Sequence, residues 1–321
     1  MNKDFVFHKI AEGKTKIIWQ AARPDEVLIE NKNTITAGDG ERRDQFIGKG
    51  YLATSTTCNI FELLKNRVPT HYKDRKDSNS FLAHRMIMIP IELVGRRIAA
   101  GSFLKRNPQV HEGSTLTPLV IEFFLKDDAG HDPMLEYDSK NDKWLVFDAK
   151  KPRSIGFIRE LPLIAVTGSN GNNSVSRRIG PYFLDELRVI AEKVFVIIEQ
   201  AWRELNITLV DLKIECGFFT DNKGLPLGEI GVGDVIDNDN WRIWPNREKS
   251  LDKSKQLYRD SGLTAELIKN YKWVAKASSI FLQKPCPDCD PPKSGKQFAQ
   301  VHDSYDLEAI PCATCHGTGL I

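Results

Sequence analysis

Residues 207–219 read ITLVDLKIECGFF, and residues 225–232 read LPLGEIGV. Both runs are rich in apolar side chains, while Asp221-Asn222-Lys223-Gly224 between them has the composition of a turn. This pattern predicts a β-hairpin over residues 207–232, with its two strands antiparallel. The elements expected before and after this hairpin complete the predicted fold.

Strand and helix patterns continue from the hairpin in both directions. Short β-rich runs separated by turn residues predict an antiparallel sheet over residues 5–36. Helices are expected at residues 49–66, 182–205 and 264–282. Polar residues predict surface loops at 136–153 and 168–174. We therefore expect a chain of the α+β class.

Composition excludes several classes of function. The 321 residues include 45 Lys and Arg and 43 Asp and Glu, a net charge of +2, which provides no general attraction to nucleic acid or anionic lipid. Apolar stretches such as Met86–Val94 are far shorter than the ~20 residues of a membrane-spanning helix. Asp4 stands where a signal peptide would begin its apolar run. We expect a cytoplasmic protein with no membrane segment and no general nucleic-acid binding.

Two lysines near the N-terminus form the first candidate phosphate site. In Glu12-Gly13-Lys14-Thr15-Lys16 they share one face at a turn between predicted strands. The segment is not a P-loop, because the G-x-x-x-x-G-K-[ST] spacing and the following helix are absent. The alternative is a solvated hairpin, since most surface lysines contact only water.

The hairpin itself carries a candidate metal site. Apolar and charged residues alternate from 209 to 215, so Asp211, Lys213 and Glu215 share one face, and the second strand ends at Asp234. Carboxylates from neighbouring strands can hold Mg²⁺ against nucleotide phosphates, because Mg²⁺ takes one or two protein oxygens together with phosphate and water. The solvent face of an edge hairpin is the alternative, and the pattern alone leaves both open.

A third segment, Ile98-Ala99-Ala100-Gly101-Ser102, combines small residues with a hydroxyl. The cations around it are Arg96, Arg97, Lys105 and Arg106. Small residues permit a close approach and the cations attract anions, so the segment suits a phosphate monoester. A basic surface loop is the alternative interpretation.

Four of the six cysteines lie in the last 36 residues and form two C-x-x-C pairs. They are Cys286, Cys289, Cys312 and Cys315. The 22 residues between the pairs match the spacing of a zinc ribbon, and four thiolates suit tetrahedral Zn²⁺. Disulfides are rare in the cytosol. We therefore expect a separate structural zinc module at residues 283–321, with a partner that the sequence does not identify.

Ten segments stand in the order in which they occur in SAICAR synthetases. They are Glu12–Lys16, Thr36–Gly40, Lys49-Gly50, Val68–His71, Ile89–Glu92, Arg96–Arg106, Phe124–Asp128, His131–Pro133, Val210–Glu215 and Trp241–Trp244. From about residue 8 to about residue 260 the chain resembles this family. The resemblance implies a two-lobed fold with the ATP cleft between a β-rich lobe at residues 1–88 and a mixed α/β lobe at residues 89–282 that carries the metal and substrate sites.

The resemblance also implies an activity. SAICAR synthetases use ATP and Mg²⁺ to join the carboxylate of the nucleotide CAIR to the amine of L-aspartate, through an acyl phosphate, and release ADP and phosphate. By resemblance, ATP would contact Lys14, Lys16 and the backbone at Met88, and the catalytic residues would be Lys213 with the Mg²⁺ ligands Glu215 and Asp234. Residues for the 5′-phosphate of CAIR would be Arg96, Ser102 and Arg242, with Lys126, Asp128 and Asp132 on the cleft wall.

The chain departs from the family directly after Asp234. Members usually have Glu next and Ser-Pro-Asp soon after, whereas residues 235–239 here read VIDND. This difference leaves open a related ligase that acts on a different amino compound or nucleotide. An alternative of another class is an inactive scaffold whose zinc tail binds protein or nucleic acid, although the retained lysines and acids argue against it. Assembly into a homo-oligomer also stays open.

Overall fold

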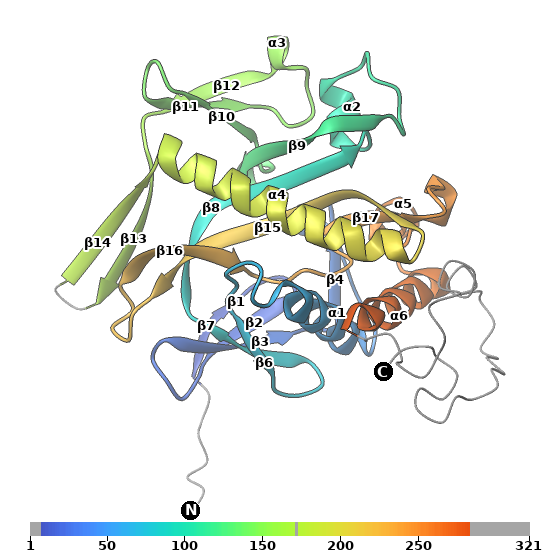
Figure 1. The fold of residues 1–321 in the computed structure, drawn as a ribbon, viewed down its shortest axis with the longest axis horizontal. Helices are drawn as coiled ribbons and strands as arrows, with labels where there is room; N and C mark the ends of the chain where they lie inside the picture. The colour runs from blue at the N-terminus through green and yellow to red at the C-terminus, as the bar shows by residue number, and fades with distance from the viewer. Residues whose placement is uncertain (1–7, 171–172, 283–321) are drawn as a thin grey trace, which may run out of the picture.

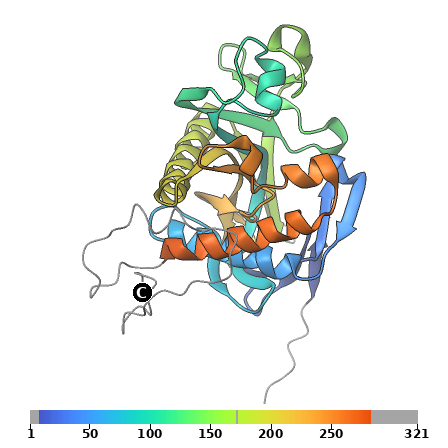
Figure 2. The same cartoon turned by 90° about the vertical axis from the view of Figure 1, so that its right-hand side faces the viewer.

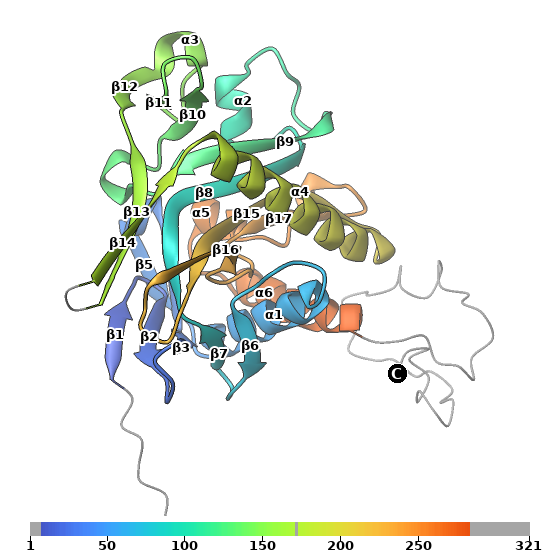
Figure 3. The same cartoon turned by 60° about the vertical axis from the view of Figure 1, so that its left-hand side comes forward.

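The computed structural model describes residues 8–170 and 173–282 (Figure 1). An antiparallel sheet of five strands, in the order β1-β2-β3-β7-β6, lies below a larger sheet in Figure 3. Its strands are β1 (Lys9–Glu12), β2 (Lys16–Gln20), β3 (Glu26–Asn31), β6 (Tyr72–Arg75) and β7 (Ser80–His84). Val27 and Ile29 of β3 alternate into the core. The antiparallel sheet predicted at residues 5–36 is therefore confirmed for its first three runs, whereas the run at residues 33–36 lies in a separate two-stranded sheet.

The connection between β3 and β6 carries a small hairpin and a long helix. The hairpin pairs β4 (Thr34–Ala37) with β5 (Arg42–Gln45), and α1 (Lys49–Leu64) follows after Gly48, whose φ of 93° suits glycine. Helix α1 packs against β3, β6 and β7. This confirms the helix predicted at 49–66.

The large sheet has eight strands, in the order β12-β11-β10-β9-β8-β15-β16, with β17 also paired to β15. They are β8 (Met86–Ile98), β9 (Thr115–Leu125), β10 (Met134–Asp138), β11 (Lys143–Phe147), β12 (Phe157–Leu161), β15 (Ile207–Thr220), β16 (Pro226–Gly233) and β17 (Trp241–Pro245). The predicted hairpin is confirmed as β15 and β16, and the Gly224 N–H donates to the Asp221 carbonyl at 2.9 Å in its turn. The short helices α2 (Ser102–Arg106) and α3 (Arg153–Gly156) lie in loops near this sheet.

Helix α4 (Pro181–Glu204) covers one face of the large sheet in Figure 1. Its buried residues recur at three- and four-residue spacing, as the amphipathic pattern predicts: Leu187, Ile190, Ala191, Val194, Phe195, Ile198, Ala201 and Trp202. Phe195 packs directly on β8, because a Cβ atom built on Gly95 would lie 2.6 Å from its Cδ2. A glycine in β8 therefore lets helix and sheet approach closely.

The last described helices return to the N-terminal part of the molecule. Helix α6 (Ala265–Ser279) lies beside α1 (Figure 2). Helix α5 (Gln256–Ser261) precedes it, and the 3₁₀ turn η4 (Ile280–Leu282) follows it. They share a second apolar cluster made of Ile35, Phe46, Leu52, Tyr258, Leu267, Tyr271 and Ala275. The helix predicted at 264–282 is confirmed.

The loops predicted at 136–153 and 168–174 are wrong. Strands β10 and β11 pair within the first segment, and β13 (Ile164–Asn170) pairs with β14 (Asn173–Ile179) around the second. In the first segment, a few apolar residues at alternating positions are enough to pack an otherwise polar strand against the core. Trp144 and Val146 point inward and are 1% and 0% exposed.

In the described ranges, no helix is both long and apolar enough to cross a membrane. The predicted boundary at residue 88 falls inside β8, and the division into lobes at 1–88 and 89–282 stays a prediction. The predicted zinc module at 283–321, with Cys286, Cys289, Cys312 and Cys315, lies outside the described residues.

Candidate active site

Two ion pairs bring distant parts of the chain to one place. Lys16 of β2 pairs with Asp234, which follows β16, and Lys126, directly after β9, pairs with Glu215 of β15. Glu215 is opposite Gly233 in the β15–β16 register, so Asp234 lies next to the residue facing Glu215. The structure therefore brings Lys16, Lys126, Glu215 and Asp234 together, and their chemical roles stay predictions.

Lys213 is held between two carboxylates. Its Nζ lies 2.5 Å from Glu92 Oε1 and 3.7 Å from Glu215 Oε1. Burial disfavours the charged form, but the carboxylates of Glu92 and Glu215 outweigh burial and raise the pKa of Lys213. Burial also raises the pKa of Glu92, against the charge of Lys213. Lys213 therefore stays a cation at neutral pH.

Asp234 stays ionised for the same reason. Burial opposes its negative charge, but Lys16, Lys126 and Lys213 overcome burial and lower the pKa of Asp234 to about 2. Glu215 is only 4% exposed, so its face of β15 is not a solvent face, and that alternative interpretation of the hairpin is wrong. Three lysines and three carboxylates thus meet where β2, β8, β9, β15 and β16 come together.

The oxygen donors at this place fit Mg²⁺ bound with ATP. Mg²⁺ usually binds nucleotide phosphates with only one or two protein carboxylates, which Glu215 and Asp234 could supply. The described part of the chain contains no group of three or more His, Cys, Asp or Glu side chains that could hold a metal by themselves. A site completed by phosphate oxygens is therefore the kind of metal site that these residues can form.

A second buried cluster contains the arginines predicted to hold a phosphate. Arg96 pairs with Glu122 and Asp211, at 3.2 Å to Asp211, and its Nη2 donates to Ser102 Oγ at 3.3 Å. Arg242 pairs with the same Asp211. Arg96 is 4% exposed, so the interpretation as a basic surface loop is wrong for this residue.

Two neighbours complete this arginine cluster. Arg106 donates to Glu122 at 2.5 Å, so three arginines share the two carboxylates of Glu122 and Asp211. Gly101, with φ of 57°, lies against Arg242, because a Cβ atom there would be 2.5 Å from Nη2. Only glycine combines that backbone conformation with so close an approach.

The remaining predicted residues lie in turns and strands near the two clusters. Lys14 lies in the turn between β1 and β2, and its side chain approaches Gly40. Met88 of β8 is paired with Gly217 of β15. Asp132 accepts a hydrogen bond from the Asp127 N–H at 2.9 Å, which fixes its own loop. Asp128 begins the 3₁₀ turn η2 (Asp128–Gly130), and its side chain lies outside the described part of the structure.

The loop that departs from the family pattern is held from three directions. Asp239 accepts hydrogen bonds from Tyr271 of α6 at 2.5 Å and from Lys255 at 3.1 Å, and Lys49 of α1 lies 3.7 Å away. Val235 is 7% exposed and belongs to the main apolar core. The position at which relatives usually have an acid therefore carries a core side chain.

Sequence reasoning assigned no role to Glu92, Glu122, Lys49 or Tyr271. Glu92 is directly opposite Glu215 in the β8–β15 register, and Glu122 reaches Arg96 across β8 and β9. Such pairings depend on which strands become neighbours. No local pattern in the sequence signals them.

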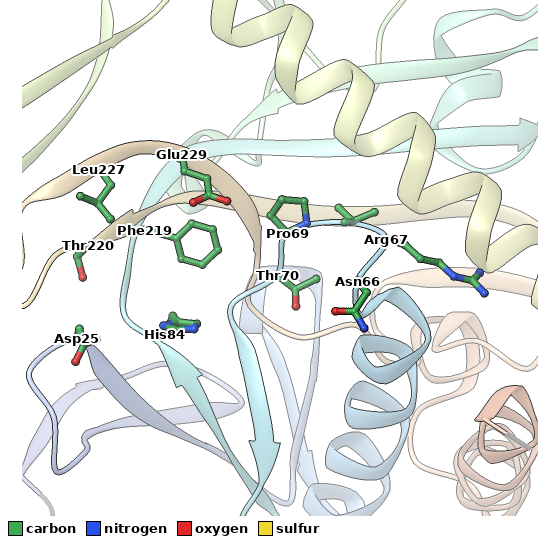
Figure 4. A pocket seen from close by; sticks show the side chains of 11 residues that line it. Asp25, Asn66, Arg67, Pro69, Thr70, His84, Phe219, Thr220, Leu227 and Glu229 are labelled. Carbon is green, nitrogen blue, oxygen red and sulfur yellow. The ribbon is translucent and has the colours of Figure 1, made fainter.

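A cavity of about 670 Å³ lies apart from both clusters. Figure 4 shows its lining residues, including His84, Phe219, Thr220, Leu227 and Glu229, between the β15–β16 hairpin and the segment after α1. None of the predicted site residues lines it. The chemistry is therefore expected at the lysine and carboxylate cluster rather than in this cavity.

Comparison with known proteins gives consistent matches. The family model described as SAICAR synthetase matches residues 9–157 and 172–277. The phosphoribosylaminoimidazole-succinocarboxamide synthase of Herpetosiphon aurantiacus is 36% identical over 269 residues, which cover 82% of this chain and 92% of that protein. A bifunctional purine synthesis protein of Dictyostelium discoideum is 38% identical over 260 residues, which are 80% of this chain and 23% of that longer protein.

Solved structures agree with these matches. The phosphoribosylaminoimidazole-succinocarboxamide synthase of Ehrlichia chaffeensis has a TM-score of 0.66 at 25% identity, over 84% of this chain and 98% of that one. A SAICAR synthetase in complex with ADP has a TM-score of 0.65 at 27% identity, over 84% and 97% of the two chains. The similarity therefore extends over the described fold.

Proposed function

The chain belongs to the SAICAR synthetase family, and we propose that it works as that family's ATP-dependent ligase of purine biosynthesis. Its substrates would be CAIR, L-aspartate and ATP, and its products SAICAR, ADP and phosphate. The observation that carries this proposal is the meeting of Lys16, Lys126 and Lys213 with the carboxylates of Glu215 and Asp234. These are the groups needed to hold a metal-bound polyphosphate.

We propose that the reaction passes through an acyl phosphate. A carboxylate oxygen of CAIR attacks the γ-phosphorus of ATP, and the bond to the β-γ bridging oxygen breaks to release ADP. The aspartate amine then attacks the activated carbonyl carbon, loses a proton, and phosphate leaves. Positioning and charge neutralisation are the main contributions that a protein can make to phosphoryl transfer.

The lysines would bind the phosphates, together with Lys14 in the β1–β2 turn. Lys16 and Lys126 now neutralise Asp234 and Glu215, and their long side chains can turn to phosphate oxygens. Bound Mg²⁺ would neutralise charge on the transferred phosphoryl group. Glu215 and Asp234 would be its ligands, and Lys213, fixed by Glu92, would keep a positive charge beside them. Adenine would meet the backbone at Met88.

The arginine cluster would hold the 5′-phosphate of CAIR. Arg96 and Arg242 share Asp211, and Arg106 fixes Glu122, so the guanidinium groups are held in place before a ligand arrives. Ser102 adds a hydroxyl beside Arg96. Guanidinium groups bind phosphate in a bidentate way, which suits these arginines to an anion. Lys126, Asp128 and Asp132 would line the route between the two clusters.

The altered loop favours the family reaction over a different substrate. Val235 and Ile236 are buried in the core, and Asp239 is held by Tyr271 and Lys255. The changed side chain at 235 therefore packs inside the protein rather than contacting a substrate. Val235 itself therefore does not select a different substrate, and the ion pairs of the lysine and carboxylate cluster argue against an inactive scaffold.

Two further parts of the proposal rest on the sequence. Cys286, Cys289, Cys312 and Cys315 would bind one structural Zn²⁺, because their spacing is that of a zinc ribbon. A cytoplasmic location is also part of the proposal, because thiols stay reduced and free to bind zinc in a reducing compartment.

The direct test is an assay of the purified full chain with ATP, Mg²⁺, CAIR and L-aspartate. We expect ADP release that requires both CAIR and aspartate, with SAICAR identified by mass. Lys16→Met should abolish it, whereas Lys9→Met, which removes an exposed pair with Glu12, should not. ADP release with another amine but not with aspartate would identify a different ligase, and no ADP release with any amine would support the scaffold.

A further inference from the structure

Glu122 of β9 is a buried carboxylate that accepts hydrogen bonds from two arginines. Its residue is 6% exposed. Arg96 donates to it from Nε, and Arg106 donates from Nη2 to both of its oxygens, at 2.5 and 2.6 Å. The two arginines come from different elements, because Arg96 lies in β8 and Arg106 is the last residue of α2. Glu122 therefore joins a strand and a helix through one carboxylate.

The bond to Glu122 helps to fix the plane of the Arg96 guanidinium. Besides Nε, which donates to Glu122, Nη1 donates to Asp211 at 3.2 Å and Nη2 donates to Ser102 Oγ at 3.3 Å. The nitrogens of a guanidinium lie in one plane and point in different directions. Partners on all of them prevent the group from turning, so Glu122 contributes to the direction of the N–H groups that remain for a ligand.

The same carboxylate also anchors the helix that carries Ser102. Helix α2 has five residues, and a helix this short is not stable by its own hydrogen bonds. Arg106 is one of its buried residues. Arg106 Nη1 donates to the Ala149 carbonyl at 2.7 Å, and the guanidinium lies over the Phe124 ring at 5.4 Å. The contact with Glu122 therefore holds the end of α2 on β9, and the position of Ser102 at its beginning depends on that contact.

We propose that Glu122 is a positioning residue for the 5′-phosphate of CAIR, which sets the Arg96 guanidinium and the Ser102 hydroxyl relative to each other. It acts on Arg96 directly and on Ser102 through Arg106 and α2. The proposal rests on the proposed function in taking the arginine cluster as the phosphate site. Arg106 is then an anchor of α2 rather than a phosphate ligand, because its Nη groups donate to Glu122 and to the Ala149 carbonyl.

Charge and position predict opposite effects of Glu122→Gln. The substitution removes a negative charge beside the arginines, so electrostatics alone predicts that a phosphate binds more tightly. Glutamine keeps the size of the side chain, but its NH₂ group would face an arginine N–H where a carboxylate oxygen now accepts. Arg96 and α2 would then move apart. We expect phosphate to bind about 10–100-fold more weakly, as for other small misplacements of a binding group.

Calorimetric titration of the full chain with SAICAR, and with the same compound lacking its 5′-phosphate, isolates this effect. The wild type should bind SAICAR more tightly than the nucleoside. Glu122→Gln should lose about 10–100-fold in affinity for SAICAR and keep its affinity for the nucleoside. Glu122→Asp keeps the charge and two acceptor oxygens, and should recover most of the affinity.

Steady-state kinetics provides a second measurement. The KM for CAIR should rise about 10–100-fold in Glu122→Gln, while kcat and the KM for ATP should change by less than about threefold. A purely structural role would instead lower the fraction of active protein and leave both KM values unchanged. That result in a folded Glu122→Gln protein would overturn the proposal.

A second arginine–glutamate pair provides the matched control. Arg97, the next residue of β8, donates to Glu199 of α4 at 2.6 and 3.1 Å. Glu199→Gln breaks this pair without touching the arginine cluster, and should leave the affinities for SAICAR and for the nucleoside unchanged. Equal losses of SAICAR affinity in Glu199→Gln and Glu122→Gln would overturn the proposal, because any lost pair on β8 would then have the same effect.

A double variant guards against misfolding of Glu122→Gln. Removing Glu122 alone leaves buried arginines short of a partner, whereas Glu122→Gln with Arg106→Met removes both members of a pair and keeps the net charge. It should show the same loss of SAICAR affinity. Wild-type affinity for SAICAR in either folded variant, or tighter binding, would overturn the proposal. If the wild type binds SAICAR through its phosphate but shows no ligase activity, the proposed function fails while the affinity ratios still decide the role of Glu122.

Discussion

Charge compensation explains the state of single residues in the active-site cluster. Lys213 and Asp234 both stay charged although burial opposes it, because each faces groups of opposite sign. An unpaired buried charge is costly, so the cluster is stable only as a set. Removing one charged side chain should therefore change the pKa values of its neighbours as well as the binding of the ligand.

The carboxylates proposed as metal ligands give the first prediction. Glu215→Gln and Asp234→Asn should each lower kcat at least about 100-fold while the protein stays folded, because they remove the charge that a metal needs. Steady-state rates over a range of Mg²⁺ concentrations measure this, with circular dichroism as a check on folding. Glu112→Gln, which affects only an exposed pair with Lys249, is the control. Near-normal turnover in both site variants would remove these residues from the metal site.

Acid stability gives a second prediction for Asp234. Its folded pKa of about 2 is below the usual 3.8, so ionised Asp234 stabilises the fold above about pH 4, and this stabilisation is lost as pH falls through 2. The free energy of unfolding, measured by urea titration without metal, should therefore fall less steeply between pH 4 and pH 2 in Asp234→Asn than in the wild type. Parallel curves would show that Asp234 has an ordinary pKa.

The arginine cluster gives a third prediction. Arg242→Ala should raise the KM for CAIR about 10–100-fold and that for ATP much less, since a lost charge-assisted hydrogen bond costs about 1.5–3 kcal/mol. Arg247→Ala, an exposed arginine nearby, should change neither KM. Equal increases in both KM values would mean that Arg242 does not belong to the CAIR side.

At the scale of elements, helix α6 stabilises the loop at residues 235–239, which directly follows Asp234. Tyr271 of α6 donates to Asp239, which also pairs with Lys255, while Lys49 of α1 lies nearby. Burial, with the charge of Asp239, raises the pKa of Tyr271 well above its usual value, so the phenol remains a donor. Helix α6 is therefore part of the support of the loop at residues 235–239.

Tyr271→Phe tests this support. The change removes one hydrogen bond to a buried carboxylate and nothing else, so the free energy of unfolding should fall by about 1.5–3 kcal/mol. Urea unfolding followed by tryptophan fluorescence measures it. Tyr182→Phe, at a position 76% exposed, should stay within about 0.5 kcal/mol of the wild type. No loss of stability in Tyr271→Phe would show that the hydroxyl contributes nothing to holding the loop.

For the whole molecule, the proposed catalytic and binding residues all lie before residue 243, while the four cysteines of the predicted zinc module begin at Cys286. We predict about one zinc per chain in metal analysis of the full-length protein, bound by the four cysteines. A protein ending at Leu282 should keep its kcat, because both clusters and their supporting helices are complete by that residue. Metal-free full-length protein would refute the zinc site. A folded but inactive shortened protein would give the last residues a part in catalysis.

Strong periodic patterns in the sequence are enough to predict the long elements. Helix α4 and the β15–β16 hairpin lie where spacing predicts them, because helix α4 carries its own apolar face and the hairpin strands are rich in apolar residues. The alternation along the first strand of the hairpin also predicts that Lys213 and Glu215 share one face. Where the pattern is weak, as at β10 and β11, polar residues conceal two strands that depend on a neighbour for their core.

The order of amino acids is sufficient to identify the family, the α+β class and the residue types of both clusters. Ordered motifs are properties of the chain alone, and so are the periodicities that produce helices and strands. Only the tertiary structure decides which charged side chains become neighbours. Lys16 contacts Asp234, 218 positions away in the sequence, and Glu92 faces Glu215 because β8 pairs with β15. The physical reason is that ion pairs, burial and the resulting pKa values depend on distances in space, which strand order and packing set.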